Sequence, residues 1–411
     1  MTGTGVPDRP AVHQVLATLG YGDAIGNEVL GIRAVLREAG YASDIFVETA
    51  DPRLEPLTRD YRDLIEASHP DNLLIHHFSI GSRASRIAYA LPDRMMLVYH
   101  NITPPEYFVG VHKDLVRLCF SGRRELRAYV HRCDLAVGDS EFNRLELEGF
   151  GFSRTAVLPV IPSFAHLDTT PDRTLVSEFD DARVNILFVG RIIPNKRIED
   201  VIRFYAAYRV KHQPNARLLL VGAYGGFESY LASLHHLIAS LGVPDVHILG
   251  HVSNAELTAC YDVADLFLSA SEHEGFCVPL IEAFYKRIPV LAYAATAVPA
   301  TMDGAGVLYE NKDPRHVAAI MHTVLSNPAL EAEIVGSQDA ALDRLLSRDF
   351  GGVLRGLVDQ ARQTPRMPAV DVRWDFWQRF AEWERLEELR LYRPSAFKAL
   401  PFAPGERGEN P

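Results

Sequence analysis

Short hydrophobic runs recur along the chain, and most of them end at a glycine or a polar residue. In the first half they predict buried strands at residues 12–18, 42–47, 73–77, 95–99, 135–138 and 155–158. In the second half they predict strands at 184–189, 217–221, 246–249, 266–269 and 289–293. Helical periodicity predicts helices at 27–38, 317–325, 330–346 and 374–392. Strands that alternate with helices are typical of an α/β fold with doubly wound parallel sheets.

The pattern fades between residues 159 and 181 into Pro, Ser, Thr and Asp, which indicates a linker between two domains. A chain of 411 residues is also too long for one ordinary hydrophobic core. We therefore divide the chain into a first domain (1–165), a linker (166–183), a second domain (184–365), and a C-terminal helix and tail (366–411).

Composition and charge narrow the classes of function. The formal net charge of −11 argues against a nucleic-acid-binding protein, which would need a basic surface. The four cysteines are too few and too scattered for a disulfide framework, and they fit a reducing compartment. No run of about 18 apolar residues is present, and the first ten residues hold no apolar signal region. We expect a cytoplasmic protein, with peripheral attachment to the inner face of the membrane left open.

One segment, between His112 and Arg132, is basic and partly amphipathic. Its cations are Lys113, Arg117, Arg123, Arg124, Arg127 and Arg132. A solvated helix face is the simpler interpretation. Contact with an anionic lipid surface or with a polyanionic acceptor is the alternative.

The stretch 269–284 carries the strongest chemical signal. It follows the apolar run 264–268, and Pro279 suits the first turn of a helix. Glu274 is then expected in the loop after a strand, and Glu282 on the helix that follows. Both carboxylates can face the crevice at the carboxyl end of the strand, where open α/β sheets bind ligands. On spacing alone, two unrelated surface carboxylates would be the commoner explanation, so the surrounding residues decide.

A second set of polar residues follows the strand 184–189. Gly190 ends that strand, and Arg191 and Lys196 precede the next helix. The planar donors of an arginine and the point charge of a lysine beside a helix start suit a diphosphate. In isolation, a pair of surface cations would be the usual explanation. Gly222 and residues 247–252 add further strand ends at the same edge, as walls for a base and a ribose.

Two features of the first half fit a ligand crevice less specifically. The loop 20–26 contains Gly20, Gly22 and Gly26, whose spacing is not that of the dinucleotide fingerprint. A tight turn and an anion contact through backbone amides both fit this loop. His100 follows a strand immediately, so it could line a crevice or make structural hydrogen bonds.

Taken in order, these residues resemble the family 4 retaining glycosyltransferases. The likeness rests on Gly190-Arg191, Lys196, residues 250–257, Ala264-Asp265, residues 274–283 and Pro289-Val290. It is dense between residues 185 and 313 and looser in the first half, where the loop 20–26 and His100 carry it. The resemblance implies the GT-B architecture, in which two Rossmann-like domains face each other across a cleft and a C-terminal helix returns toward the first domain.

The resemblance also implies a role for each matching residue. Arg191 and Lys196 would hold the donor diphosphate, Glu282 the ribose hydroxyls and Glu274 the hydroxyls of the donor sugar. His100 would reach the donor sugar from the opposite domain. The implied catalytic set is His100, Arg191, Lys196 and Glu274. The implied donor-binding set is Gly22, Gly26, Gly190, Gly222, Val252, Phe276, Cys277, Val278 and Glu282.

The implied reaction is the transfer of a hexose from a nucleoside-diphosphate sugar, with retention at the anomeric carbon. The acceptor would be a glycan or a lipid-linked molecule in polysaccharide or glycoconjugate biosynthesis. The sequence has no Asp-x-Asp metal motif, so we expect no metal and no cofactor. Same-face attack is favoured over double displacement, because no carboxylate is an unambiguous nucleophile. The alternatives are an epimerase or phosphorylase of the same architecture, and a sugar-nucleotide sensor or inactive partner subunit.

Three positions depart from the family pattern. Cys277 and Arg287 stand where the family usually has glycine, and Ala300 stands where many members have glutamate. Arg287 bears more on how a helix ends than on chemistry. These departures concern the identity of the donor sugar more than the reaction.

Overall fold

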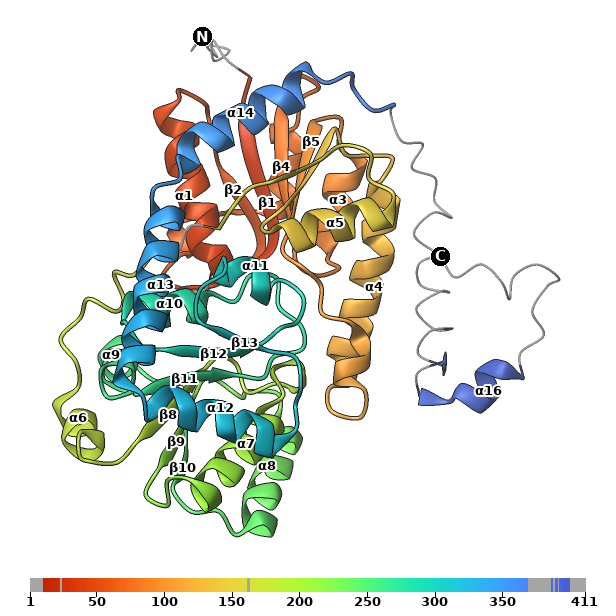
Figure 1. Cartoon of the computed structure of the whole chain (residues 1–411). Helices are drawn as coiled ribbons and strands as arrows, with labels where there is room; N and C mark the ends of the chain where they lie inside the picture. The colour runs from red at the N-terminus through yellow and green to blue at the C-terminus, as the bar shows by residue number, and fades with distance from the viewer. Residues whose placement is uncertain are drawn as a thin grey trace.

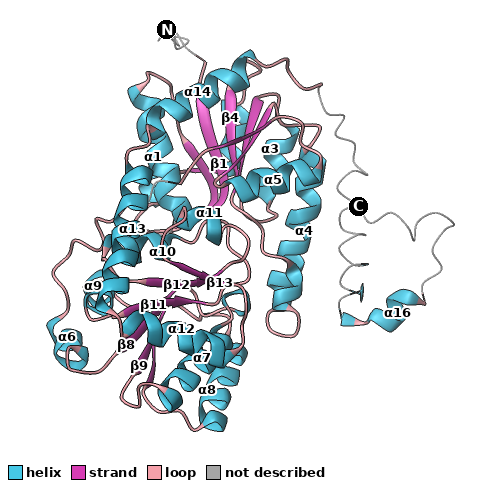
Figure 2. Cartoon of the chain, in the orientation of Figure 1, coloured by secondary structure: helices cyan, strands magenta, loops and turns pink. Residues whose placement is uncertain are grey.

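The protein is described here from a computed structural model that covers residues 10–22, 24–160, 163–368, 386, 389–390 and 392–399. It contains two parallel β-sheets, one in each half of the chain, with helices packed on their faces (Figures 1 and 2). The first sheet has the order β3-β2-β1-β4-β5-β6-β7, with β1 (Val12–Leu19), β2 (Ile45–Ala50), β3 (Arg59–Asp60), β4 (Leu73–Phe78), β5 (Arg94–Tyr99), β6 (Leu135–Gly138) and β7 (Thr155–Val157). The second has the order β10-β9-β8-β11-β12-β13, with β8 (Asn185–Val189), β9 (Arg217–Val221), β10 (Val246–Gly250), β11 (Leu266–Ser269), β12 (Val290–Tyr293) and β13 (Val307–Tyr309).

Helices connect the strands of each sheet. In the first half they are α1 (Ala24–Glu38), η1 (Glu55–Leu57), η2 (Tyr61–Asp63), α2 (Leu64–Ala67), α3 (Arg83–Ala90), η3 (Pro105–Phe108), α4 (Lys113–Tyr129) and α5 (Glu141–Phe150). The second half has α6 (Arg173–Phe179), η4 (Pro194–Lys196), α7 (Ile198–Lys211), α8 (Glu228–Leu241), α9 (Asn254–Asp262), α10 (Val278–Tyr285), α11 (Val298–Met302), α12 (Pro314–Leu325) and α13 (Pro328–Leu346). They are followed by α14 (Phe350–Gln363) and the short α16 (Pro394–Lys398).

The hydrophobic runs form strands because parallel strands are buried on both faces of a covered sheet. Strands β4 and β9, for example, are buried along their whole length. The predicted strand 42–47 is displaced to 45–50, because its polar end continues the pairing and Thr49 Oγ1 lies 2.8 Å from Thr18 Oγ1 on β1. The sequence missed β3 and β13, which have two and three residues at sheet edges.

Helix α14 returns to the first sheet, where it lies across the strands in Figure 1. Its residues Leu354, Leu357 and Val358 are buried in a core that also contains Val12 and Leu73. Helix α14 lies within the range 184–365 that the sequence assigned to the second domain, but it packs on the first sheet. The predicted helix 374–392 falls almost wholly outside the described residues.

The carboxyl ends of the two sets of strands face each other. Ser140, just after β6, donates from its hydroxyl to the carbonyl of Gly275, just after β11, at 2.9 Å. A Cβ on Gly275 would lie 3.1 Å from both Asn101 Cβ and the His100 carbonyl, so the two halves meet closely at this glycine. Within the described ranges, no helix is both long enough and apolar enough to cross a bilayer.

Candidate active site

Lys196 and Glu274 form the centre of the site in the second half. The Lys196 Nζ lies 2.6 Å from each carboxylate oxygen of Glu274, and the two side chains are only 18% and 7% exposed. Burial by itself would lower the pKa of Lys196, but the Glu274 carboxylate outweighs it and the pKa is raised. The guanidinium of Arg191 is close enough to oppose this rise. Two cations and one carboxylate therefore share one small region.

The loops that carry this pair are tied together by their backbones. Asn195 donates from its side chain to the His273 carbonyl at 3.0 Å, and the Glu272 amide donates to the Asn195 carbonyl at 2.9 Å. Lys312 bridges the same region, because its Nζ donates to a Glu272 oxygen at 2.8 Å and to the Ala270 carbonyl at 2.9 Å. Lys196 and Glu274 thus sit in a preorganised frame.

Arg191 is exposed at the end of β8, with its guanidinium carbon 5.7 Å from the ring centre of Phe227. The Phe227 ring in turn lies 5.9 Å from Phe108 and 5.2 Å from His112, both from the first half of the chain. Arg191 therefore lies beside a contact between the two halves, with its charge accessible to a ligand.

Gly190 and Gly222 require the absence of a side chain. Their φ angles are 152° and 150°, and a Cβ on Gly222 would lie 1.9 Å from the Gly190 carbonyl oxygen. The Gly190 amide donates to the Val221 carbonyl at 2.9 Å. These two glycines bring the ends of β8 and β9 together at the base of the Arg191 loop.

Backbone strain gathers around the site. Asn101, Arg197, Cys277 and Thr296 have φ angles between 49° and 77°, in the left-handed region that favours glycine. Thr296 accepts a hydrogen bond from the Glu274 amide at 2.9 Å, which links one of these residues directly to the site. Such strain persists where the surrounding structure holds it, and it is concentrated at functional sites.

Cys277 and Arg287, which stand where the resembled family usually has glycine, both have a left-handed backbone conformation. Cys277 has φ 77° immediately before α10, and Arg287 has φ 57° just after it. The Ile288 amide donates to the Ala283 carbonyl at 2.9 Å, so Arg287 acts in helix termination, as the sequence suggested. Burial and the nearby Glu274 carboxylate raise the pKa of the Cys277 thiol. Ala300 is exposed on α11.

Glu282 lies on α10 and is engaged on both oxygens. Tyr261 donates to its Oε2 at 2.8 Å, and His166 Nε2 lies 2.9 Å from its Oε1. Phe276 and Val252 are half-buried and pack against the same core as this helix. Val278, also half-buried, is the first residue of α10.

In the first half, Gly22 and Gly26 lie on either side of the start of α1. Gly22 is exposed with φ 74° and open space where a Cβ would sit, which suits the tight turn. Gly26 is buried in the first turn of α1, two residues before Glu28.

His100 is engaged through both nitrogens of its ring. Its Nε2 lies 3.0 Å from His77 Nδ1, and its Nδ1 lies 3.6 Å from Glu28 and 3.7 Å from Asp139. His77 Nε2 lies 2.9 Å from Gln14 Oε1 on β1. Since an amide oxygen only accepts, His77 donates to Gln14, and His100 Nε2 then donates to His77. In this arrangement the ring of His100 makes structural contacts within the first half.

Burial shapes the charges of this network. It raises the pKa of Glu28 to about 7, against the opposing effect of His100, and it also raises the pKa of Asp139. Burial lowers the pKa of His77. One oxygen of Glu28 is buried without a hydrogen-bond partner among the described residues. Gln14, Glu28 and His77 come from β1, α1 and β4, and Asp139 follows β6. None of them belongs to a local motif, so the sequence did not single them out.

The basic segment between His112 and Arg132 is partly structural. Arg132 is buried and donates to the carbonyls of Tyr89, Leu91 and Asp93. Arg123 pairs with Glu146 at 2.7 Å. Arg124 and Arg127 are half-buried, and Lys113 and Arg117 are exposed at the start of α4. A solvated helix face with structural cations describes this segment.

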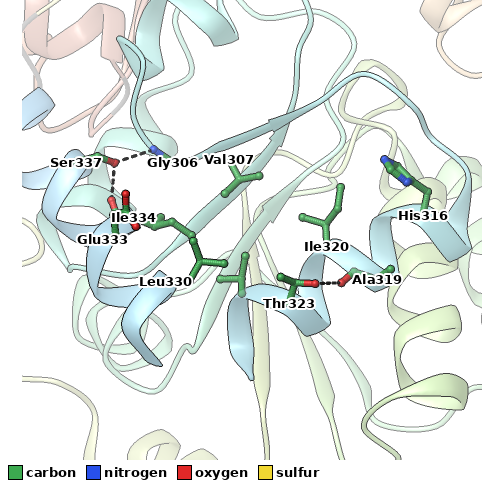
Figure 3. Close-up of a pocket in the computed structure, with 11 residues that line it drawn as sticks. Gly306, Val307, His316, Ala319, Ile320, Thr323, Leu330, Glu333, Ile334 and Ser337 are labelled. Carbon is green, nitrogen blue, oxygen red and sulfur yellow. Dashed lines mark hydrogen bonds between the residues drawn. The ribbon is translucent and has the colours of Figure 1, made fainter. Parts of the chain in front are cut away.

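A cavity of about 540 Å³ lies elsewhere, between β13, α12 and α13 (Figure 3). Its lining is mainly hydrophobic, with Val307, Ile320, Leu330 and Ile334 among the labelled residues. The Thr323 hydroxyl on this lining bonds the Ala319 carbonyl of its own helix. None of the candidate site residues is among the described residues that line it.

Comparison with solved structures identifies the architecture. The Anabaena protein Alr3699/HepE, solved in complex with UDP-glucose, superposes with a TM-score of 0.65 over 85% of this chain and 99% of that one, at 16% identity. The fold is GT-B. The facing Rossmann-like halves and the returning helix expected for a GT-B protein are therefore confirmed.

Sequence comparison places the likeness mainly in the second half. Residues 176–337 match the family model described as "Glycosyl transferases group 1". D-inositol 3-phosphate glycosyltransferase of Kineococcus radiotolerans is 31% identical over 223 residues, 49% of this chain and 51% of that protein. O-antigen chain mannosyltransferase B of Escherichia coli is 26% identical over 278 residues, 66% of each. The matched part of the chain thus spans between half and just under two thirds of the length of these relatives. The matches support a group 1 glycosyltransferase.

Proposed function

We propose that this protein transfers a hexose from a nucleoside-diphosphate sugar to a glycan or lipid-linked acceptor, with retention at the anomeric carbon. The observation that carries the proposal is the Lys196–Glu274 pair beside Arg191, at the edge of the second sheet that faces the first. The match to the group 1 family model includes all three residues. The relatives named for mannosyl and inositol-phosphate glycosyl transfer support the same class of reaction.

The cations would act on the leaving group. When the bond between the anomeric carbon and the phosphate oxygen breaks, its electron pair moves to the diphosphate. Arg191 and Lys196 would stabilise that charge in place of a metal ion. Losing such a preorganised donor typically costs about 3–4 kcal/mol of transition-state stabilisation. Glu274 would hold hydroxyls of the sugar, and Glu282 those of the ribose.

We favour attack from the face of departure. The acceptor oxygen would bond to the anomeric carbon while its proton passes to the departing phosphate oxygen. Glu274 is paired with Lys196 at 2.6 Å, which makes it a poor nucleophile for a covalent intermediate. The buried Glu28 is turned toward His100. A contact of His100 with the donor sugar, which the resemblance implies, would require its ring to exchange one of its present partners, because both nitrogens are engaged.

The test is a turnover assay without added metal. Purified protein is mixed with a panel of nucleoside-diphosphate hexoses, with and without EDTA, and release of the nucleoside diphosphate is followed by chromatography. We expect slow, EDTA-insensitive hydrolysis of at least one donor, and about a hundredfold less with Arg191→Ala. Binding of a donor with no turnover of any kind would favour a sensor or inactive subunit instead.

Contact with an anionic membrane stays a prediction, narrowed to the exposed start of α4. Lys113 and Arg117 lie there beside the exposed Leu118. Binding to anionic vesicles should weaken as salt is raised. Equal partitioning onto neutral and anionic vesicles would contradict this prediction.

A further inference from the structure

Residues 163–169 form a strap that is fixed to the second half of the chain. The ring of Phe164 stacks on Tyr285 with centroids 4.3 Å apart and planes 3° apart, and Leu167 is buried in the second core. Tyr285 also donates from its hydroxyl to Asp168 at 2.5 Å. The strap therefore holds His166 in place beside α10.

The ring of His166 is held by the Glu282 carboxylate and by the backbone of the strap. Its Nε2 lies 2.9 Å from Glu282 Oε1, and the ring is also hydrogen-bonded to the backbone of Ser163. The bond to Glu282, followed by its charge, raises the pKa of His166 above its ordinary value despite partial burial. Both contacts favour the protonated imidazole, because a carboxylate only accepts hydrogen bonds.

Glu282 keeps acceptor positions that its contacts with Tyr261 and His166 do not use. An ionised carboxylate offers about four acceptor positions, and Tyr261 and His166 use one on each oxygen. Burial, followed by Glu282, raises the pKa of Tyr261 well above its ordinary value, so its hydroxyl remains a donor. The Glu282 side chain is 9% exposed and that of His166 is 27% exposed. The free acceptor positions of a carboxylate held from two sides suit two neighbouring hydroxyls.

We infer that His166 is a specificity-determining positioning residue, which holds Glu282 to receive the ribose diol of a nucleoside diphosphate. The inference deepens the proposed function and rests on it. His166 acts through Glu282 by fixing the carboxylate and by offsetting its negative charge, which would otherwise repel the anionic ligand. A site that hydrogen-bonds a hydroxyl rejects an analogue without it. By holding His166 against Glu282, the strap would make the nucleotide-binding part of the site selective for ribose over deoxyribose.

The protonation of His166 also makes binding depend on pH. The charged and titratable groups facing His166 are Glu282 and Tyr261 on the helices and Asp168 on the strap. As pH rises through the raised pKa of His166, the imidazole loses its charge and the offset is lost. Affinity should therefore fall across that window. The titration of the ligand's own phosphate is common to all variants and cancels in the comparison.

The experiment measures dissociation constants by calorimetry for the common ribonucleoside diphosphates and for the 2′-deoxy form of the tightest binder. The proteins are wild type, His166→Gln, His166→Ala and the control His235→Gln, whose histidine is exposed on α8. In His166→Ala we expect roughly tenfold weaker binding of the ribonucleotide and a smaller preference for ribose. His166→Gln should keep part of the preference but lose the pH dependence. The control should match wild type.

The outcomes separate this inference from the proposed function. If wild type binds none of the nucleoside diphosphates, both fall. If wild type binds and prefers ribose but both His166 variants keep the same affinity and preference, only the inference on His166 falls. Tighter binding by the variants would also overturn it, because His166 would then be blocking Glu282.

Discussion

Substituting Lys196 should show how much its ion pair with Glu274 contributes to the free energy of unfolding. In Lys196→Met, the Glu274 carboxylate stays buried at 7% exposure without its cation. Removing one partner of a buried pair costs about 3–5 kcal/mol, and the 18% exposure of Lys196 places this one near 3 kcal/mol. Glu274→Gln should cost about 2 kcal/mol, because the lysine is less buried and can reach water. The double variant leaves no unpaired charge and should cost about 2 kcal/mol, so the coupling energy is about 3 kcal/mol.

The assay is urea denaturation of wild type, the two single variants and the double variant. A control cycle uses Lys286 and Asp262, whose charged atoms are 2.9 Å apart but whose carboxylate is 37% exposed. That pair should couple by less than about 1 kcal/mol. The pKa of Lys196 is raised, so its contribution is complete below the ordinary lysine value and is lost only as pH rises through the raised one. The coupling should therefore be constant between about pH 6 and 9. A coupling energy no larger than that of the control pair would show that the buried Glu274 carboxylate does not depend on Lys196.

Three further predictions follow from single positions. Gly222→Ala should destabilise the protein by more than about 3 kcal/mol in urea denaturation and abolish donor binding, because its Cβ meets the Gly190 carbonyl. Gly356→Ala in α14 should instead stabilise it by about 1 kcal/mol in the same assay. Cys277→Gly should change stability by less than about 1 kcal/mol, while Cys277→Val at φ 77° should cost about 2 kcal/mol; equal losses would contradict this. The raised pKa of Glu28 means that the folded state binds its proton more tightly than the unfolded state does. The free energy of unfolding should therefore fall as pH rises from about 4.5 to about 7, by up to about 1.4 kcal/mol per pH unit. Glu28→Gln should remove this dependence on pH.

The sequence predicted the elements whose hydrophobic pattern is complete. Strand β9 reads as an unbroken apolar run because both of its faces are buried. Edge strand β13 has three residues, two of them partly or fully exposed, so it has no such pattern. The packing of α14 on the first sheet could not be predicted either, since an amphipathic helix carries no mark of the sheet on which it packs.

The site divides in the same way. Lys196 and Glu274 were predicted to face the same crevice because each belongs to a local motif at a strand end. Their direct contact was not predicted, and the structure shows it. His166 lies in a linker without a motif, and its partner is 116 positions away. Glu28 and Asp139 meet His100 only through the folding of the first sheet. Contacts of this kind depend on tertiary geometry, which a single sequence does not display.

We propose that Arg191 and the Lys196–Glu274 pair bind a nucleoside-diphosphate sugar where the two sheets face each other. The most direct measurement is calorimetric titration of a donor panel into wild type, Arg191→Ala and the control His316→Ala at the separate cavity of Figure 3. We expect at least one donor to bind wild type and the control equally well, and to bind Arg191→Ala at least tenfold more weakly. No binding by wild type, or equal binding by all three proteins, would contradict it.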